Sequence, residues 1–147
     1  AAKETIARSM GATDFLTVGS DTVELVKELT DGLGADYSFD AVGNIEIAEM
    51  LLPSLRERGT ALLVGVPPTD SRIKVDATDL LRQEKRLTGT IYGSADTAVD
   101  FEKYAHMYLS GELPIDKLIS NHYKIDEINQ ACEDMLSGDI ARGVVTF

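Results

Sequence analysis

Short apolar runs that end at glycine or proline alternate with amphipathic stretches along the first two thirds of the chain. The clearest run is Gly59–Pro68 (GTALLVGVPP), which is too short for a helix and is bounded by residues that break regular structure. This pattern predicts a strand buried on both faces of a parallel sheet. Ligands bind at the carboxyl ends of such strands, so Val64-Gly65-Val66 is a candidate site. Gly65 has no side chain, and a flat ligand could lie against the backbone there.

The same patterns predict further strands and helices. Strands are predicted over residues 14–18, 35–42, 60–66, 86–92, 119–125 and 143–147. Helices are predicted over residues 1–10, 21–30, 45–55, 76–84, 96–109, 114–118 and 127–136. Ser20, Asp76 and Asp126 precede helical stretches and are expected to cap them. Strands and helices that alternate at spacings of about 25 residues indicate a right-handed parallel α/β unit.

The pattern changes in the last third of the chain. After Gly93–Ala95, a long amphipathic helix is followed by elements that show no alternation with buried parallel strands. We therefore expect one structural unit over residues 1–93 and a second over residues 94–147.

The composition of the chain excludes several classes of function. The 147 residues are enough for a domain with a core, and the net charge of −11 argues against a nucleic-acid partner. No apolar run reaches the roughly 18 residues of a membrane helix. The start, AAKETIARSMGA, resembles no signal peptide and lacks Met, so we expect a processed chain or a piece of a longer one. The single cysteine, Cys132, excludes internal disulfides and suits a cytoplasmic protein.

The strand-end turns are the best candidates for binding a small molecule. Val42-Gly43-Asn44 and Val64-Gly65-Val66 each follow a predicted strand, although glycines also simply end strands. Arg142 precedes a glycine and could bind a phosphate through charge-assisted hydrogen bonds, or it could be a solvated surface side chain. No glycine-rich dinucleotide fingerprint, P-loop or zinc pattern occurs in the sequence.

The titratable residues form no catalytic constellation in the sequence. His106 and His122 are at no metal-ligand spacing, and Cys132 fits a small core residue. Carboxylates crowd around the predicted strand 35–42, but nothing positions a partner acid or base. We expect these carboxylates to lie at solvent-exposed sheet ends: Asp36, Asp40 and Glu46.

Several segments, in their order and spacing, resemble a known family. They are ARSMGATDFL, ADYSFDAVGN, GTALLVGVPP, RLTGTIYG, LPIDKLISNHYKIDEINQACEDMLSG and ARGVVTF. Together they are similar to the C-terminal part of the zinc-dependent medium-chain alcohol dehydrogenases. The nearest branch resembles the class III type, the glutathione- or mycothiol-dependent formaldehyde dehydrogenases. The similarity runs from residue 1 to residue 147.

The resemblance implies an α/β fold in which a Rossmann-type parallel sheet is incomplete. Its first two strands, the glycine-rich turn, the ribose-binding acid and all zinc ligands of the family pattern would precede Ala1. Residues 1–93 would be a partial dinucleotide-binding domain, and residues 94–147 would return to the catalytic domain as an α+β segment. Strand 14–18 would lack its neighbour, so either it covers the apolar edge at 35–42 or another chain does so by swapping.

The resemblance also implies cofactor contacts but no catalytic or metal-binding residue. Contacts with the ribose units are implied for Lys3, Val42 and Gly43. Contacts with the nicotinamide carboxamide are implied for Val64, Gly65, Val66, Thr90 and Tyr92. Arg142 matches an arginine near the pyrophosphate. Strand 86–92 matches an edge strand that pairs with its symmetry mate in a homodimer.

The implied reaction is hydride transfer between an alcohol or thiol adduct and NAD(H), with zinc in the parent chain only. We expect the 147-residue chain alone to be inactive, because it holds no zinc ligand set. The alternative is a non-catalytic α/β nucleotide-binding or dimerisation module. The residues leave open which alcohol is used and whether the cofactor is NAD or NADP, since the discriminating acid would precede Ala1. No nucleic-acid or membrane partner is expected.

Overall fold

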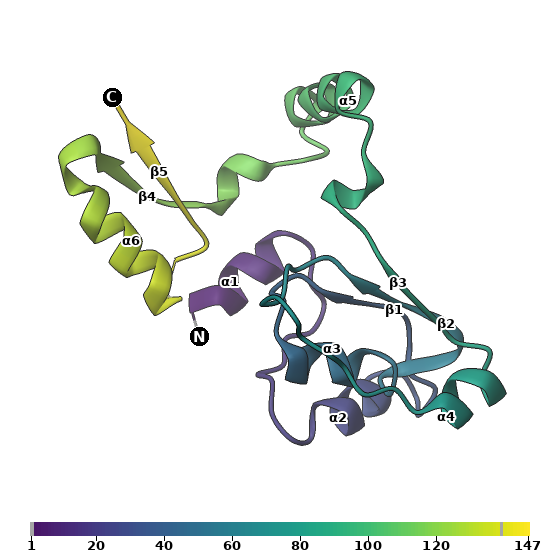
Figure 1. The fold of residues 1–147 in the computed structure, drawn as a ribbon. Coiled ribbons are helices and arrows are strands. Elements are labelled where there is room, and N and C mark those ends of the chain that lie inside the picture. Colours follow the sequence, from purple (N-terminus) through teal and green to yellow (C-terminus); the bar gives the residue numbers. More distant parts are fainter. Residues whose placement is uncertain (1, 139) are drawn as a thin grey trace. The chain divides into compact units, whose positions relative to one another are not determined.

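The computed structural model describes residues 2–138 and 140–147. They divide into two compact units. Leu16–Ala95 is the three-stranded unit, and the residues up to Phe15 group with those from Asp96 onward as the two-stranded unit (Figure 1). The sequence-based prediction had placed the first fifteen residues in the same unit as residues 16–93. The assignment of residues 1–93 and 94–147 to a cofactor domain and a catalytic domain remains a prediction.

The three-stranded unit is a parallel α/β sheet, as the strand–helix alternation predicts. Its strands are β1 (Ala35–Asp40), β2 (Leu55–Leu63) and β3 (Arg86–Gly89), in the order β1-β2-β3 and all parallel. The helices of this unit are α2 (Thr22–Glu28), α3 (Ile45–Leu51) and α4 (Ala77–Arg82) (Figure 1).

The core of this unit lies between the sheet and the helices α3 and α4. Leu51 and Leu52, at the end of α3, pack with Leu55 and Ala61 of β2, and Leu80 of α4 packs against this cluster. The other face of β1 is open, because Tyr37 and Phe39 are 64% and 59% exposed. Burial on both faces was predicted for the strand 60–66. Residues 59–63 of β2 are buried or half-buried, whereas Val64 and Val66, beyond the end of β2, are exposed.

Local side chains start two of these helices. The Asn44 Oδ1 accepts a hydrogen bond of 3.1 Å from Ile47 N at α3, and the Asp76 Oδ1 accepts from Thr78 N at 2.8 Å at α4. The cap by Asp76 is confirmed. The predicted cap by Ser20 is wrong: α2 begins one residue later, after Asp21, which makes no side-chain cap hydrogen bond.

An irregularity divides β2 into two parts. Its register with β1 passes from Ala35↔Leu55 to Tyr37↔Thr60, so extra residues of β2 bulge between these pairs. Arg58, at φ 63°, turns the chain there, and its guanidinium pairs with Glu84 at 2.8 Å. Regular pairing from Thr60 matches the predicted start of this strand, but the strand ends at Leu63 instead of residue 66.

Two predicted strand segments are wrong. Residues 14–18 form no strand, because they pair with no other strand in the described chain, and β1 remains an end strand of the sheet. β3 ends at Gly89, and residues Tyr92–Ser94 form a 3₁₀ turn (η1) instead. Tyr92, Gly93 and Ser94 all have positive φ, which no extended strand accommodates.

The two-stranded unit contains a second parallel pair. β4 (Ile119–Lys124) and β5 (Arg142–Thr146) pair in parallel, and α6 (Ile128–Ser137) connects them. The expectation that this third shows no alternation with parallel strands is therefore wrong, because α6 is a crossover helix of the kind that parallel pairing requires. The unit also contains α1 (Ala2–Ser9), α5 (Thr97–Ser110) and the 3₁₀ turns η2 (Ile115–Leu118) and η3 (Ile125–Glu127).

A polar network ties β4 to α6. The buried Tyr123 hydroxyl donates to Asp134 Oδ2 at 2.6 Å and accepts from Asn121 Nδ2 at 2.9 Å, while Gln130 Nε2 donates to Asp134 Oδ1. The hydrogen bond to Asp134 raises the pKa of Tyr123, and the same bond lowers the pKa of Asp134. The predicted cap by Asp126 is wrong, because α6 begins after Glu127, which makes no side-chain cap hydrogen bond. Glu127 Oε2 instead accepts from Lys124 N at the start of η3.

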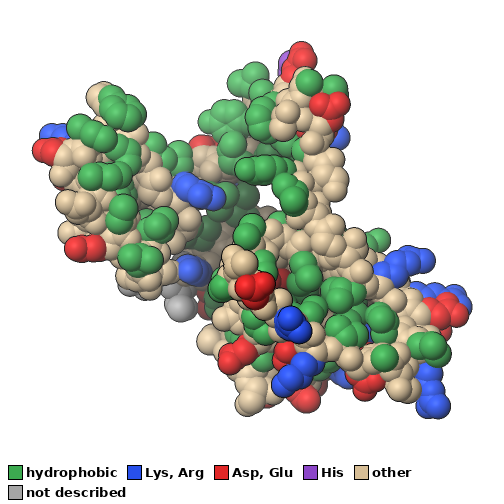
Figure 2. Space-filling model, viewed as in Figure 1, with side chains coloured by type: hydrophobic (Ala, Val, Ile, Leu, Met, Phe, Trp, Pro, Cys, Tyr) green, Lys and Arg blue, Asp and Glu red, His purple; other side chains and the backbone are tan. Residues whose placement is uncertain are grey.

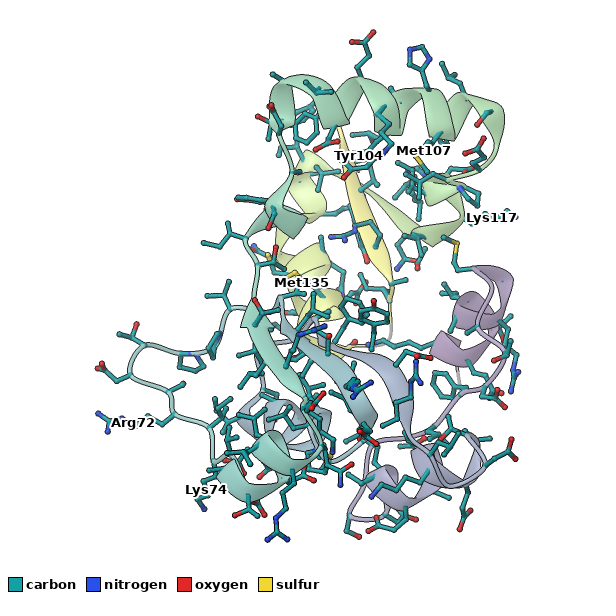
Figure 3. All side chains as sticks on the ribbon, turned by 90° about the vertical axis from the view of Figure 1, so that its right-hand side faces the viewer. Arg72, Lys74, Tyr104, Met107, Lys117 and Met135 are labelled. Atoms are coloured by element: carbon teal, nitrogen blue, oxygen red, sulfur yellow. The ribbon has the colours of Figure 1, made fainter. Side chains whose placement is uncertain are left out.

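Helix α5 exists as predicted, but it buries no residue. Asp96 Oδ1 caps it by accepting from Ala98 N at 3.1 Å. Tyr104 and Met107 project from the same side of the helix (Figure 3). Hydrophobic side chains remain at the surface over this helix, among them Phe101 and Leu109 (Figure 2). None of the described helices combines the length and the apolar character that crossing a membrane requires.

Candidate functional site

A shallow hollow lies at the carboxyl ends of β2 and β3 in the three-stranded unit. Its volume is about 660 Å³. It lies where open parallel sheets bind their ligands. The lining residues are Leu63, Val64, Gly65, Val66, Pro67, Gly89, Thr90, Ile91 and Ser94. We call this feature the strand-end hollow.

The turn after β1 lies directly against the turn after β2. A Cβ on Gly65 would be 2.1 Å from Gly43 N and 2.6 Å from Val42 N, and a Cβ on Gly43 would be 2.5 Å from Val66 O. These distances are shorter than real Cβ contacts, so both positions require glycine. Gly43 also has a φ of +81°, a conformation that glycine adopts without strain.

These contacts give a different reason for the glycine at position 65 from the one that the sequence suggested. The sequence indicated that the missing side chain leaves room for a flat ligand, whereas in the structure it leaves room for the neighbouring turn. The absence of a side chain at Gly65 therefore allows the segments Val42–Gly43 and Val64–Val66 to pack against each other.

Asp40 was expected at a solvent-exposed sheet end but is only 2% exposed. Its Oδ1 accepts hydrogen bonds from Val42 N at 2.8 Å and from Gly43 N at 2.9 Å. These backbone donors replace the water that the carboxylate loses on burial. The predicted exposure of Asp40 is therefore wrong, although an aspartate shortly before a turn glycine is a known signal for local hydrogen bonding.

The end of β3 contributes polar groups to the hollow. Thr90 N donates to Leu63 O at 3.0 Å, and the hydroxyls of Thr90 and Ser94 lie 3.0 Å apart in a hydrogen bond. Ser94 was not among the predicted contacts, and it reaches the hollow because the turn with positive φ at residues 92–94 folds the chain back. Tyr92 is 87% exposed and does not line the hollow.

Free backbone groups at the hollow suit an amide ligand. Within the described residues, Val66 N–H and Val64 C=O make no hydrogen bond inside the chain, whereas Val64 N and Gly65 N both donate to Asp40 O. A carboxamide offers both an acceptor and donors, so it complements these free groups. The residues present thus fit the nicotinamide end of a dinucleotide.

The loop after the hollow carries basic side chains that do not line it. Arg72 and Lys74 project outward from the segment between β2 and α4 (Figure 3). Lys74 N donates to Glu49 Oε1 at 2.9 Å, which fastens this loop to α3.

The remaining predicted contacts, Lys3 and Arg142, belong to the two-stranded unit. Lys3 lies at the C-terminal end of α6, where its Nζ would be 3.7 Å from a Cβ on Gly138. Arg142 begins β5 and lines a small apolar hollow of about 210 Å³ together with Cys132 and Met135 of α6. The structure thus brings together Val42, Gly43, Val64, Gly65, Val66 and Thr90 within the three-stranded unit.

A zinc site does not fit the residues present. The described residues contain no group of three or more His, Cys, Asp or Glu side chains that could hold a metal ion. The whole sequence has one Cys and two His.

Comparison with known proteins identifies the family. Residues 1–109 match the zinc-binding dehydrogenase family, so the chain belongs to it. The chain is 30% identical over 146 residues to the putative alcohol dehydrogenase D of Mycobacterium tuberculosis, covering 97% of this chain and 40% of that protein. It is 29% identical over 148 residues to the geraniol dehydrogenase of Carpoglyphus lactis, covering 99% of this chain and 38% of that protein.

The fold agrees with that of a solved dehydrogenase structure. The structure of benzyl alcohol dehydrogenase from Acinetobacter calcoaceticus superposes with a TM-score of 0.86 at 29% identity, covering 96% of this chain and 39% of that one. The chain thus spans about 40% of the length of the relatives it matches. These relatives are named as dehydrogenases that act on alcohols, and the matching family is described as zinc-binding dehydrogenases. The names of these relatives single out no class III branch.

Proposed function

We propose that this chain supplies the nicotinamide side of the cofactor site in an NAD(H)-dependent, zinc-type alcohol dehydrogenase. One observation carries the proposal. The turns after β1, β2 and β3 converge at one edge of a parallel sheet, and free backbone groups line the strand-end hollow between β2 and β3. The parent reaction is hydride transfer between an alcohol and the nicotinamide ring.

In this proposal, the backbone at Val64 and Val66 orients the nicotinamide ring through its carboxamide. The Val66 N–H donates to the amide oxygen, and the Val64 C=O accepts from the amide nitrogen. Thr90 N is already bonded to Leu63 O, so Thr90 contributes its carbonyl. The nicotinamide ring, when bound, supplies the hydride chemistry. A fixed ring orientation is what the protein adds, because hydride transfer requires a near-attack geometry.

The more distant contacts belong to the same proposal. Val42 and Gly43 lie under the ribose units, and Gly65 supports both turns. The side chain of Tyr92 does not line the hollow, so its backbone is proposed to complete the carboxamide site. Lys3 is proposed to contact the adenosine ribose and Arg142 the pyrophosphate. The assignments of Lys3, Tyr92 and Arg142 rest on the family resemblance alone, and those of Val42, Gly43 and Gly65 rest also on their positions after β1 and β2.

Finer features are also proposed. The motifs favour the class III, thiol-adduct branch, and the single cysteine favours a cytoplasmic location. The outer edge of β3 is unpaired in the sheet order β1-β2-β3, and it would pair with a second copy in a homodimer.

Binding of the cofactor is tested by NMR titration of the 147-residue chain with NADH. Without a glycine-rich phosphate turn we expect millimolar affinity, worth about 4 kcal/mol. Amide shifts should change at Val66, Ile91 and Ser94 and should stay constant at Leu51 in the core. Saturating NADH without any shift at the hollow would refute the proposal.

The chain alone is proposed to be inactive, because its residues hold no zinc ligand set. NADH formation measured with simple alcohols, NAD and added zinc should stay at the level of the blank. Robust turnover would overturn this point.

A second candidate is a non-catalytic module that only binds a nucleotide or dimerises. The free edge of β3 favours it. Sedimentation velocity and the titration are read together. A dimer that does not bind NADH supports a dimerisation module. NADH binding with amide shifts at the strand-end hollow supports the dehydrogenase half-site, and NADH binding with shifts elsewhere supports a nucleotide-binding module.

A further inference from the structure

Asp40 makes two sets of hydrogen bonds, one from its backbone and one from its side chain. It ends β1, and its carbonyl oxygen accepts from Val64 N at 2.9 Å and from Gly65 N at 2.8 Å, both in the turn after β2. These bonds extend the parallel pairing of β1 and β2 past the last ladder pair, Asp40↔Leu63. The backbone of Asp40 therefore holds the second turn.

The side chain of the same residue holds the first turn. Its carboxylate accepts from Val42 N and from Gly43 N through Oδ1, and Oδ2 lies 3.2 Å from Gly43 N as well. Hydrogen bonds to an ionised acceptor are shorter and stronger than those between neutral groups. The carboxylate is almost fully buried, so water does not compete for these donors.

We infer that Asp40 is the positioning residue that sets the distance between the turn at Val42–Gly43 and the turn at Val64–Val66. This inference rests on the proposed function, because these are the segments proposed to contact the ribose and the carboxamide. The two turns touch through glycines that cannot carry a Cβ, so a small displacement of one turn displaces the other. Asp40 acts through the backbone groups of the hollow and is not itself a ligand of the cofactor.

Asp36 provides a matched control on the same strand. Its carboxylate is exposed and pairs with Arg56, at the opposite end of β1 from the turns. Asp36→Ala removes one negative charge from β1 without touching the site, whereas Asp40→Ala removes the acceptor of the first turn. Asp40→Asn removes the charge but keeps an oxygen that can accept from the same two amides.

Amide hydrogen exchange of the free chain tests the positioning role without a ligand. The bonds from Val64 N and Gly65 N go to the backbone oxygen of residue 40 and need no particular side chain. In Asp40→Ala we nevertheless expect exchange at these two amides to accelerate at least tenfold, while Ala61 in mid-strand stays within threefold. Asp40→Asn should restore most of the protection, and Asp36→Ala should change none of it.

A contrary result would be unambiguous. The inference fails if only Val42 and Gly43 exchange faster in Asp40→Ala, because the side chain would then hold a single turn. It also fails if all amides of the unit accelerate equally, because the role would then be general stability. If Asp40→Ala does not fold, Asp40→Ser and Asp40→Asn are compared by the same two criteria.

NADH titration adds the functional readout. We expect the dissociation constant to rise at least fivefold in Asp40→Ala and to stay within twofold in Asp40→Asn and Asp36→Ala. Unchanged affinity in Asp40→Ala would overturn the inference. If the unaltered chain shows no binding, the proposed function fails, and the exchange experiment alone still decides whether Asp40 holds both turns.

Discussion

Gly65 and Gly43 lie in direct backbone contact, and a Cβ on Gly65 would be only 2.1 Å from Gly43 N. We predict that Gly65→Ala destabilises the chain by about 3 kcal/mol or more, since overpacking against backbone forces whole segments to move. Urea denaturation measures this change in the free energy of unfolding.

Gly89→Ala is the matched control for this prediction. Its Cβ would lie 3.8 Å from Leu63 O, an ordinary contact, at the end of the neighbouring strand. We expect its effect to stay within about 1 kcal/mol. Equal effects of the two substitutions would show that the turns are not closely packed in solution.

Lys85 is a buried lysine whose ammonium is hydrogen-bonded. Its side chain is 5% exposed, and Nζ donates to Leu52 O at 3.0 Å and to Asp79 Oδ2 at 2.9 Å. We predict that Lys85→Met costs about 1–3 kcal/mol, because the carbonyl at the C-terminal end of α3 loses its partner. Lys74→Met, at an exposed position of the same unit, should change stability by less than about 0.5 kcal/mol. Thermal unfolding of both variants makes the comparison.

The pair of Tyr123 and Asp134 predicts a pH dependence. The hydrogen bond to Asp134 raises the pKa of Tyr123 above its ordinary value of 10.0, so its stabilising contribution is present below that pH and declines as the pH rises further. The bond from Tyr123 lowers the pKa of Asp134 below 3.8, so its contribution is present above that pH and is lost in stronger acid.

Tyr123→Phe should therefore be less stable than the unaltered chain at neutral pH. This difference in unfolding free energy should shrink above pH 10 and below about pH 4. Tyr104→Phe, on the exposed helix α5, should show no such profile. A constant difference between the stabilities of Tyr123→Phe and the unaltered chain across pH 7 to 11 would contradict the assignment.

The open face and edge of β1 predict self-association. Tyr37 and Phe39 are exposed on an end strand, which offers unpaired backbone groups beside apolar side chains. Phe39→Lys should lower the association of the chain by at least fivefold in sedimentation equilibrium. Val99→Lys, which adds the same charge on α5, should leave association unchanged. If both variants behave alike, net charge and not the edge governs association.

Much of the fold follows from the sequence because its signals are local. Apolar runs that end at glycine predicted β1 and β2, and the acidic residue before Ala77 predicted the start of α4. Strand ends were less predictable. A strand ends where pairing with its neighbour stops, which for β2 and β3 is at Leu63↔Gly89. The side chains of Val64 and Thr90 do not indicate this end, because both residue types are common in strands.

The candidate site was predictable in outline. Glycines 43 and 65 marked the two turns, but their mutual contact depends on the register of β1 and β2, which no local pattern states. Asp40 was missed because a charged residue in a strand usually indicates exposure. Residues 14–18 show the opposite error, since an apolar run forms a strand only where a neighbour supplies hydrogen bonds.

The bulge between Leu55 and Thr60 gives β2 a place to absorb changes in length. Pairing from Tyr37↔Thr60 to Asp40↔Leu63 is regular and begins only after the bulge. Insertions or deletions near Arg58 would therefore alter a surface kink and leave the alignment of the downstream residues unshifted. Homologues could therefore differ in length at this bulge and still keep the same pairing between β1 and β2 at the carboxyl ends of the strands.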